Sequence, residues 1–370
     1  MSTPAVKFNR QDNPEFFKVL NQRVNQYFKD RNLSKHANLG MVIKTVAMLS
    51  LYLVPLVLML SGVISGLWPV IGMWVIMGFG MSGIGLAVMH DANHRAYSQN
   101  PKVNKLVGNV LNLIGGYPAN WRIQHNVLHH SFTNIEEHDE DFDTPVLRCS
   151  PNQERKGFHR FQAFYAPLVY GLMTIYWLLS KDFEQLVRYN KMGLLAGQQL
   201  TLKKAMGQLI FNKLWYIGLV LVLPILFVDL PWWQVLLGFL LMQYISGVIL
   251  ALVFQPAHVI EETSFYEVDD TGSVENSWAI HQLRTTANFA NSNRPLSWYV
   301  GGLNYQIEHH LFPNICHVHY RKLAPIVKST AKEYGIPYYE HKTFYKALKS
   351  HFTHLHRMGS GRYDGEVSVA

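Results

Sequence analysis

The chain has 370 residues, of which 49% are hydrophobic, yet its mean hydropathy is only +0.01. This balance excludes a protein made almost wholly of lipid-buried helices and favours a few membrane spans joined to a large polar part. The formal net charge is +8, but the basic residues form no dense Lys/Arg run, so a surface that meets anionic lipid or a phosphorylated carrier explains the charge better than nucleic acid. Two cysteines are too few for an iron–sulfur cluster, and the absence of CxxCH and GxGxxG motifs argues against haem or flavin in this chain.

The first expected membrane element is a hairpin. Residues 1–40 form a polar segment rich in Lys and Arg, which the positive-inside tendency places in the cytoplasm. Residues 41–60 and 68–89 are apolar stretches of about 20 residues, long enough to cross a bilayer. The link between them carries no charge, so we expect the chain to return to the cytoplasm at His90.

Two groups of histidines follow this hairpin. His90 and His94 lie in HDANH, and His125, His129 and His130 lie in HNVLHH. Residues at positions i and i+4 share one face of a helix, so both rings of such a pair can reach the same ion. Neutral imidazole is a ligand for iron, copper, zinc and nickel. The spacing therefore predicts metal ligands.

The next apolar stretch, residues 161–179, is nearly long enough to span a membrane. If it crossed once, the basic residues after it would lie outside, and later histidines would face away from the first two groups. We therefore interpret it as an interfacial or re-entrant helix, rich in Tyr and Trp. Residues 103–119 are interpreted as a shorter helix of the same kind.

A second hairpin is expected from residues 209–228 and 232–254, whose link has no positive charge. It precedes a third histidine group, His309 and His310 in QIEHH. Seven histidines in three groups are too many for one tetrahedral zinc, so they predict two metal ions with open coordination positions.

These elements predict an all-α integral membrane protein. Four transmembrane helices form two hairpins, and interfacial helices and a cytoplasmic helical cap complete the fold and hold the histidine-rich di-metal site. Residues 1–40 form a cytoplasmic segment, residues 41–357 form the membrane domain, and residues 358–370 are expected to be a disordered tail.

The motifs HDANH, HNVLHH and QIEHHLFP, on a chain with two membrane hairpins, resemble those of the membrane-bound fatty acid desaturases. The resemblance covers roughly residues 39–337 and is most specific at residues 304–313 and 322–325. It implies a non-haem centre with two irons, dioxygen as the oxidant and a fatty acyl chain as the substrate. The glutamine that opens the third motif is similar to that of the front-end branch, which inserts a double bond between an existing one and the carboxyl end.

One departure from the family concerns electron supply. Many eukaryotic front-end desaturases carry a fused cytochrome b5 domain with an HPGG motif, which this sequence lacks. The resemblance is therefore to the bacterial form, and we expect ferredoxin or cytochrome b5 as a separate electron donor. It also implies an acyl-CoA or phospholipid substrate and a bacterial inner membrane location. The positive-inside tendency places the active site on the cytoplasmic face.

The seven histidines of the three motifs are expected to be catalytic metal ligands. Gln306 stands where other desaturases have a further histidine, and it either ligates through its amide oxygen or orders a water. The resemblance also suggests a ligand at His258, after the last span, although a histidine at a helix end can simply meet the negative end of the dipole.

Carboxylates and amides near the ligands are candidates to orient the metal-bound imidazoles. The acidic stretch after the second motif either orients the metal-bound imidazoles in this way or is simply a solvated loop. The complete set expected to support the ligands is Asp91, Asn93, His138, Asp139, Asp141, Asn288 and Asn304. Headgroup contacts, carrier contacts or the plain surface are expected for His281, His317 and His319. The protein surface is expected for His36, His159, His341, His351, His354 and His356.

Two other functions remain open at this point. A lipid or carotenoid hydroxylase uses the same kind of histidine framework, and the ligand set cannot separate it from a desaturase, although QIEHHLFP favours desaturation. A non-catalytic metal-binding membrane protein is a more remote alternative. It predicts ionisable residues within the spans, but the expected spans contain only Lys44 and Lys213, both near span ends.

Overall fold

The computed structural model describes residues 6–142 and 144–362. It divides into two compact units, each assembled from separate stretches of chain. Unit 1 comprises residues 1–37, 124–166 and 252–370, and unit 2 comprises residues 38–123 and 167–251.

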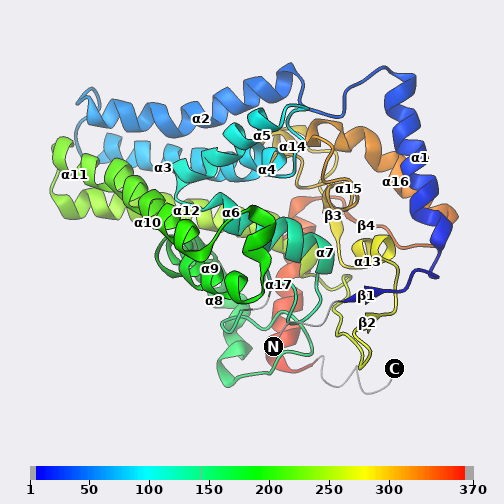
Figure 1. Cartoon of the computed structure of the whole chain (residues 1–370). Coiled ribbons are helices and arrows are strands. Elements are labelled where there is room, and N and C mark those ends of the chain that lie inside the picture. The colour runs from blue at the N-terminus through cyan, green and yellow to red at the C-terminus, as the bar shows by residue number, and fades with distance from the viewer. Residues whose placement is uncertain (1–5, 143, 363–370) are drawn as a thin grey trace. The chain divides into compact units, whose positions relative to one another are not determined.

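Unit 2 begins with two long apolar helices that lie side by side (Figure 1). Helix α2 (Leu39–Leu60) starts at Asn38, whose side chain accepts a hydrogen bond from the Met41 amide. Helix α3 (Leu67–Gly83) continues through a π-helical turn, η1 (Ile84–Val88), into α4 (Met89–Asn93). Because Gly80 has no side chain, α3 approaches the α2 backbone closely; a Cβ at Gly80 would lie 2.6 Å from the backbone nitrogen of Tyr52.

The rest of unit 2 is also helical. Its shorter elements are α5 (Pro101–Gly108), η2 (Asn109–Ile114), α6 (Pro118–Trp121), α9 (Asp182–Lys191), η6 (Leu194–Gln198), α10 (Leu202–Ile217), η7 (Gly218–Val222) and α11 (Leu223–Phe227). Buried Lys213 of α10 is paired with buried Asp182 of α9 at 2.5 Å, and it also donates to the carbonyl of Gly115. A buried charge requires such partners, so this contact ties the two helices together.

Two helices run from one unit into the other along the chain. Helix α8 (Gln162–Tyr176), which is preceded by η4 (Gly157–Phe161), continues through η5 (Trp177–Lys181) into α9. Helix α12 (Trp232–His258) ends at a histidine.

Among the described residues, five helical runs are long and apolar enough to cross a membrane. They are Leu39–Leu60, Leu67–Asn93, Gly157–Lys191, Leu202–Phe227 and Trp232–His258. Four of these runs contain, or all but contain, the spans expected from the sequence. The additional run, Gly157–Lys191, contains the segment expected to be interfacial, and its mean hydropathy of 1.3 is the lowest of the five. Large apolar side chains on these runs are exposed, as is typical of lipid-facing helices.

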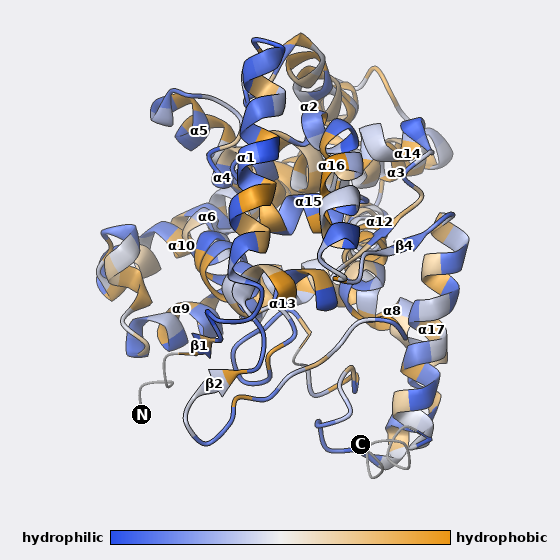
Figure 2. Ribbon diagram, turned by 90° about the vertical axis from the view of Figure 1, so that its right-hand side faces the viewer, coloured by the Kyte–Doolittle hydropathy of each residue, from blue (hydrophilic) through white to orange (hydrophobic). Residues whose placement is uncertain are grey.

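Unit 1 is a helical body with two small strand pairs. Helix α1 (Pro14–Asp30) presents Phe16, Leu20 and Val24 to a core that includes Leu323 and Val327 of α16 (Tyr320–Glu333). The spacing of the α1 residues places them on one face, and Figure 2 shows hydrophobic and hydrophilic residues alternating along this helix. The parallel strand pairs are β1 (Lys7–Phe8) with β2 (Ser273–Val274), and β3 (Ala287–Phe289) with β4 (Tyr339–His341).

The remaining elements of unit 1 carry or surround the histidines. They are η3 (Arg122–His129, whose first two residues belong to unit 2), α7 (His130–Phe132), α13 (Trp278–Arg284), α14 (Arg294–Tyr299), α15 (Gln306–Leu311), η8 (His317–His319) and α17 (Phe344–Ser360). The helical fold class is confirmed, and the short strands are an addition that the sequence did not predict. Helix α17 extends into the predicted tail, of which residues 363–370 lie outside the described residues.

Candidate metal centre

Six of the imidazoles expected to bind metal are buried in unit 1, and they come from four elements. The second histidine motif lies on η3 and α7, where His125 and His129 belong to a π-helical turn and His130 starts the next helix. The third motif lies on α15, and His258 ends α12. Each of these side chains is less than a tenth exposed. Burying so many imidazoles together is costly unless their nitrogens find partners, which makes their polar contacts informative.

Three of the imidazoles form a first cluster. One ring nitrogen each of His129, His258 and His310 lies within 4.8 Å of the others. Among the described residues, the Nε2 atoms of His129 and His258 are buried without a hydrogen-bond partner. Unpaired buried nitrogens are rare in proteins, and nitrogens that converge in this way are suited to a metal ion.

The opposite nitrogens of the same rings are occupied by acceptors. The Nδ1–H of His129 donates to Oδ2 of Asp139 at 3.0 Å, and the Nδ1–H of His258 donates to the backbone carbonyl of Thr285 at 3.1 Å. A carbonyl or carboxylate can only accept, so the proton is held on Nδ1 and the lone pair is on Nε2. Metal-binding histidines characteristically have this arrangement.

Asp139 is itself held in place by the backbone. The amide of Asn134 donates to its Oδ2 at 2.9 Å, and the amide of Asp141 donates to its Oδ1 at 3.0 Å. Burial alone lowers the pKa of His129, but the carboxylates of Asp139 and Asp141 outweigh that effect, so its pKa is raised. The same charges favour a metal cation at the ring.

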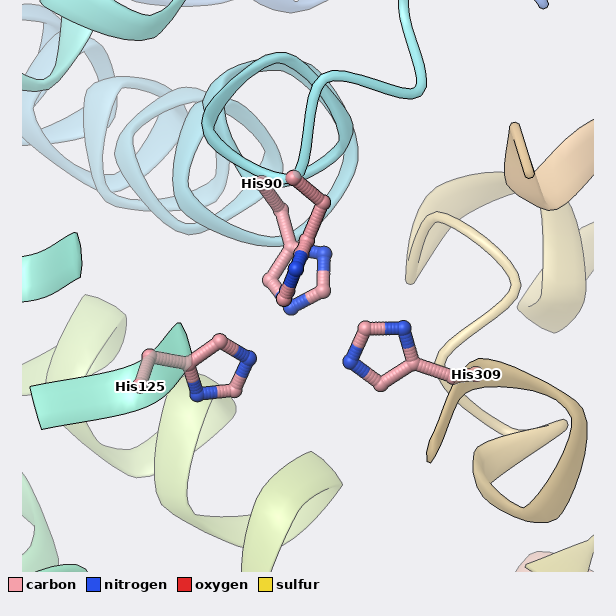
Figure 3. Close-up of side chains that lie close together, drawn as sticks. His90, His125 and His309 are labelled. Atoms are coloured by element: carbon pink, nitrogen blue, oxygen red, sulfur yellow. The ribbon is translucent and has the colours of Figure 1, made fainter. Parts of the chain in front are cut away.

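The other three imidazoles form a second cluster. The Nε2 of His130 lies 2.9 Å from the Nε2 of His309 and 3.3 Å from the Nε2 of His125. Figure 3 shows the rings of His125 and His309 extending toward each other from different elements, with near-parallel planes and centroids 5.8 Å apart. Nδ1 of His309 lies 3.2 Å from the hydroxyl of Tyr320. The two clusters adjoin, since the rings of His130 and His310 stack at 4.4 Å.

The first histidine motif belongs to unit 2. His90 lies in α4 and His94 directly follows it, with ring centroids 4.9 Å apart. Both rings pack edge-on against Trp121, at 5.4 and 5.7 Å. The predicted sharing of one helix face therefore holds for this pair.

The residues expected to support the first motif have different contacts. Oδ1 of Asp91 lies 3.9 Å from Nδ1 of His90, too far for a hydrogen bond. Asn93 donates to the carbonyls of Met89 and Gly108 and accepts a hydrogen bond from Arg122, so it braces the surrounding helices.

Around the second motif, the expected supporting residues also differ. Asp139 contacts a ligand candidate directly, whereas Oδ2 of Asp141 stays 3.7 Å from Nδ1 of His129. His138 donates from Nδ1 to the carbonyl of Glu136 and packs against Phe132.

Around the third motif, two asparagines support the backbone. Asn288 accepts from the Ile307 amide at 2.9 Å and donates to Glu308 at 2.8 Å. Asn304 donates to the carbonyl of Phe289 and to the hydroxyl of Ser297. Gln306 is buried as the first residue of α15. Glu308 is fully buried, and burial raises its pKa to about 7.

Several histidines expected at the surface, or in headgroup or carrier contacts, are instead buried. These are His159, His281, His317, His319, His351 and His354. His281 donates to the carbonyl of Thr133, His351 to that of Val259 and His354 to that of Cys149, each at 2.7 Å. One backbone carbonyl satisfies the single N–H of a neutral imidazole while the ring packs with its neighbours. For these three residues the surface expectation failed because the sequence does not reveal such an acceptor. His36 and His341 are half-buried, and His356 is exposed.

The contacts that sequence reasoning missed come from residues without a metal-binding pattern. The side chain of Gln282 contacts His310, the hydroxyl of Tyr320 contacts His309, and the carbonyl of Thr285 contacts His258. The acceptors of His258 and His310 lie 27 and 28 residues away in the chain, so no local spacing could have indicated them.

Comparison with known proteins places these histidines in a family context. A family model described as fatty acid desaturase matches residues 65–342. The chain is 37% identical over 367 residues to the sn-1 linoleoyl-lipid 6-desaturase of Synechocystis sp., covering 97% of this chain and 99% of that protein. It is 35% identical to the protein of the same name from Arthrospira platensis, covering 93% and 92%, and 35% identical to the acyl-lipid (8-3)-desaturase of Physcomitrium patens, covering 96% and 74%.

Proposed function

This chain belongs to the fatty acid desaturase family, and we propose that it inserts a double bond into a lipid-linked acyl chain on the carboxyl side of an existing one. Two relatives matched over more than nine-tenths of both chains bear the name sn-1 linoleoyl-lipid 6-desaturase, which supports a linoleoyl lipid as substrate and carbon 6 as the position. Two adjacent methylenes each lose one hydrogen. Dioxygen takes up these hydrogens together with two further electrons and two protons, giving two waters.

We propose that the histidines hold two irons. The ligands would be His90, His94, His125, His129, His130, His258, His309 and His310, with Gln306 as a further candidate. The observation that carries this proposal is the pair of buried Nε2 atoms of His129 and His258, each on a ring whose Nδ1–H is held by an acceptor. Neutral nitrogen donors fit redox-active iron. When bound, iron with open positions supplies the oxidising power needed to take hydrogen from an unactivated methylene.

The residues of this chain have separate roles in that reaction. The imidazoles bind the irons, while Asp139 and the Thr285 carbonyl fix the tautomers of His129 and His258. The two electrons would come from a separate carrier, for which ferredoxin and cytochrome b5 are the candidates. Burial of both clusters in unit 1 keeps bulk water from the oxidising centre.

We further propose that the chain crosses the membrane four times, with the centre on the cytoplasmic side of a bacterial inner membrane. Within unit 1, His130 and His309 lie against each other, so the chain between them crosses the membrane an even number of times. Three candidate helical runs lie between them. One of these runs therefore does not complete a crossing, and Gly157–Lys191 is the weakest candidate by hydropathy.

The proposed activity is tested by lipid analysis. The chain would be expressed in a host without polyunsaturated lipids that is supplied with linoleic acid. We expect linoleoyl lipids with one further double bond at carbon 6. A hydroxylated acyl chain as the main product would contradict the proposal and favour a hydroxylase.

The proposed centre is tested by metal analysis of active protein. We expect two irons per chain and loss of product in His94→Ala, His129→Ala and His310→Ala variants that still insert into the membrane. A reproducible single zinc with full activity would overturn the di-iron assignment.

A further inference from the structure

We infer that Gln282 is a positioning residue that holds the tautomer of His310 required for metal binding. This inference rests on the proposed di-iron function. Gln282 lies on α13, outside all three histidine motifs, and its side chain is completely buried.

The contact itself is short and directional. Oε1 of Gln282 lies 2.7 Å from Nδ1 of His310. The hydroxyl of Thr133 lies 2.9 Å from the same oxygen and 2.7 Å from the His129 carbonyl, and these two acceptors share its single hydrogen. The hydroxyl oxygen also lies 3.3 Å from Nδ1 of His310, farther than Oε1 of Gln282. One amide oxygen therefore serves a candidate ligand from the third motif and a residue just after the second.

The direction of the Gln282 amide determines where His310 carries its proton. With Oε1 facing the ring, Nδ1 must donate, and the lone pair lies on Nε2. With the amide reversed, its NH2 group would face Nδ1, which would then have to accept, and the ring proton would move to Nε2. Only the first arrangement leaves the nitrogen opposite Gln282 available to a metal.

Helix α13 also contacts the other histidines, which keeps Gln282 in register. Trp278 donates from Nε1 to the carbonyl of His130 at 3.1 Å, and His281 donates to the carbonyl of Thr133 at 2.7 Å. Thr285, which follows α13, provides the carbonyl that accepts from His258. Successive residues of this segment thus contact the second motif, the third motif and His258.

Gln282 gives the first cluster an uneven set of acceptors. His129 is held by a carboxylate, His258 by a backbone carbonyl and His310 by a neutral amide. The Gln282 amide is a neutral side chain, so a substitution can remove this acceptor without also removing a charge. Its loss therefore isolates hydrogen bonding from electrostatics.

The inference is tested with three variants of the full-length protein in lipid nanodiscs. Gln282→Leu keeps a similar size but removes the acceptor, and Gln282→Glu keeps an acceptor. Gln162→Leu is the matched control, because Gln162 is equally buried in unit 1 and its side chain hydrogen-bonds to the backbone of Arg148 and Leu355. The measurements are anaerobic Fe²⁺ titration against a competing chelator and thermal unfolding of the metal-free protein.

We expect Gln282→Leu to bind iron about 10–100-fold more weakly, as is usual when the partner of a metal-bound imidazole is lost. Gln282→Glu should recover most of that affinity. Gln162→Leu should lower the unfolding temperature while its folded fraction binds iron as the wild type does. Unchanged affinity in Gln282→Leu, or an equal loss in Gln162→Leu, would overturn the inference. A wild-type protein that binds no iron pair would instead overturn the proposed function.

Discussion

At the scale of single residues, the centre is defined as much by the acceptors behind the imidazoles as by the imidazoles themselves. His129 is the clearest case, because burial and charge act on it in opposite directions. Burial disfavours a charged ring, and the carboxylates of Asp139, at 3.0 Å, and Asp141 together more than compensate. The Asp139 carboxylate is held by two backbone amides, so it is already in position for the proposed metal site.

Replacing Asp139 by asparagine should weaken iron binding by about 10–100-fold, because the variant loses the charge that favours a cation at His129. Asp141→Asn is the matched control, since its Oδ2 is 3.7 Å from Nδ1 of His129 and should matter less. Both variants would be measured by iron stoichiometry and product formation. Equal losses in the two would show that general negative charge, and not the specific contact, is responsible.

The buried histidines of α17 predict a pH dependence. The pKa values of His351 and His354 are lowered by burial from 6.5 to about 4. A lowered folded-state pKa means that the unfolded chain binds more protons, so stability is lost as the pH falls from 6.5 towards 4. In the variant His351→Gln/His354→Gln, glutamine can still donate to a carbonyl but does not titrate. Thermal unfolding of this variant should therefore depend less on pH over that interval, whereas a profile parallel to the wild type would contradict the assignment.

At the scale of helices, the sequence predicts those features of the fold that depend on a local pattern of residues. The apolar stretches identify α2, α3 and α12 because about 20 consecutive apolar residues are an unambiguous signal. The i, i+4 spacing likewise predicts that His90 and His94 share a face. The acceptors of His258 and His310 could not be predicted, because they come from distant residues whose types are common in any loop or helix.

Close packing between α2 and α3 should make Gly80 intolerant of a side chain. A Cβ there would meet the α2 backbone at 2.6 Å, and backbone atoms cannot move aside cheaply. Gly80→Ala should therefore lower the free energy of unfolding by about 1–3 kcal/mol. At Gly72, also in α3, a Cβ would meet no atom within 4 Å, so Gly72→Ala should be neutral or stabilising by up to about 1 kcal/mol. Thermal unfolding in detergent compares the two, and a stable Gly80→Ala protein would refute the close approach.

At the scale of the whole molecule, chain topology and metal chemistry constrain each other. The second and third histidine motifs meet in unit 1, so both must lie on the same side of the membrane, whichever of the helical runs between them cross it. Composition alone allows three crossings in that interval, an odd number. Near the end of the run Gly157–Lys191, the buried carboxylate of Asp182 pairs with Lys213 of α10, and a buried charge at this place is consistent with a run that does not complete its crossing.

Cysteine labelling decides this point. In a background in which the buried Cys149 and Cys316 are replaced, Gly197→Cys would probe the segment after that run, where a side chain meets no neighbour. Asp229→Cys would probe the exposed link of the second hairpin. A membrane-impermeant thiol reagent should label position 197 only in inverted vesicles and position 229 only in right-side-out vesicles. Labelling of both from the same face would exclude a crossing by residues 202–227. Labelling of position 197 solely from outside would mean that Gly157–Lys191 does cross the membrane. A different run between His130 and His309 would then have to turn back, because the contact between those two histidines still requires an even number of crossings.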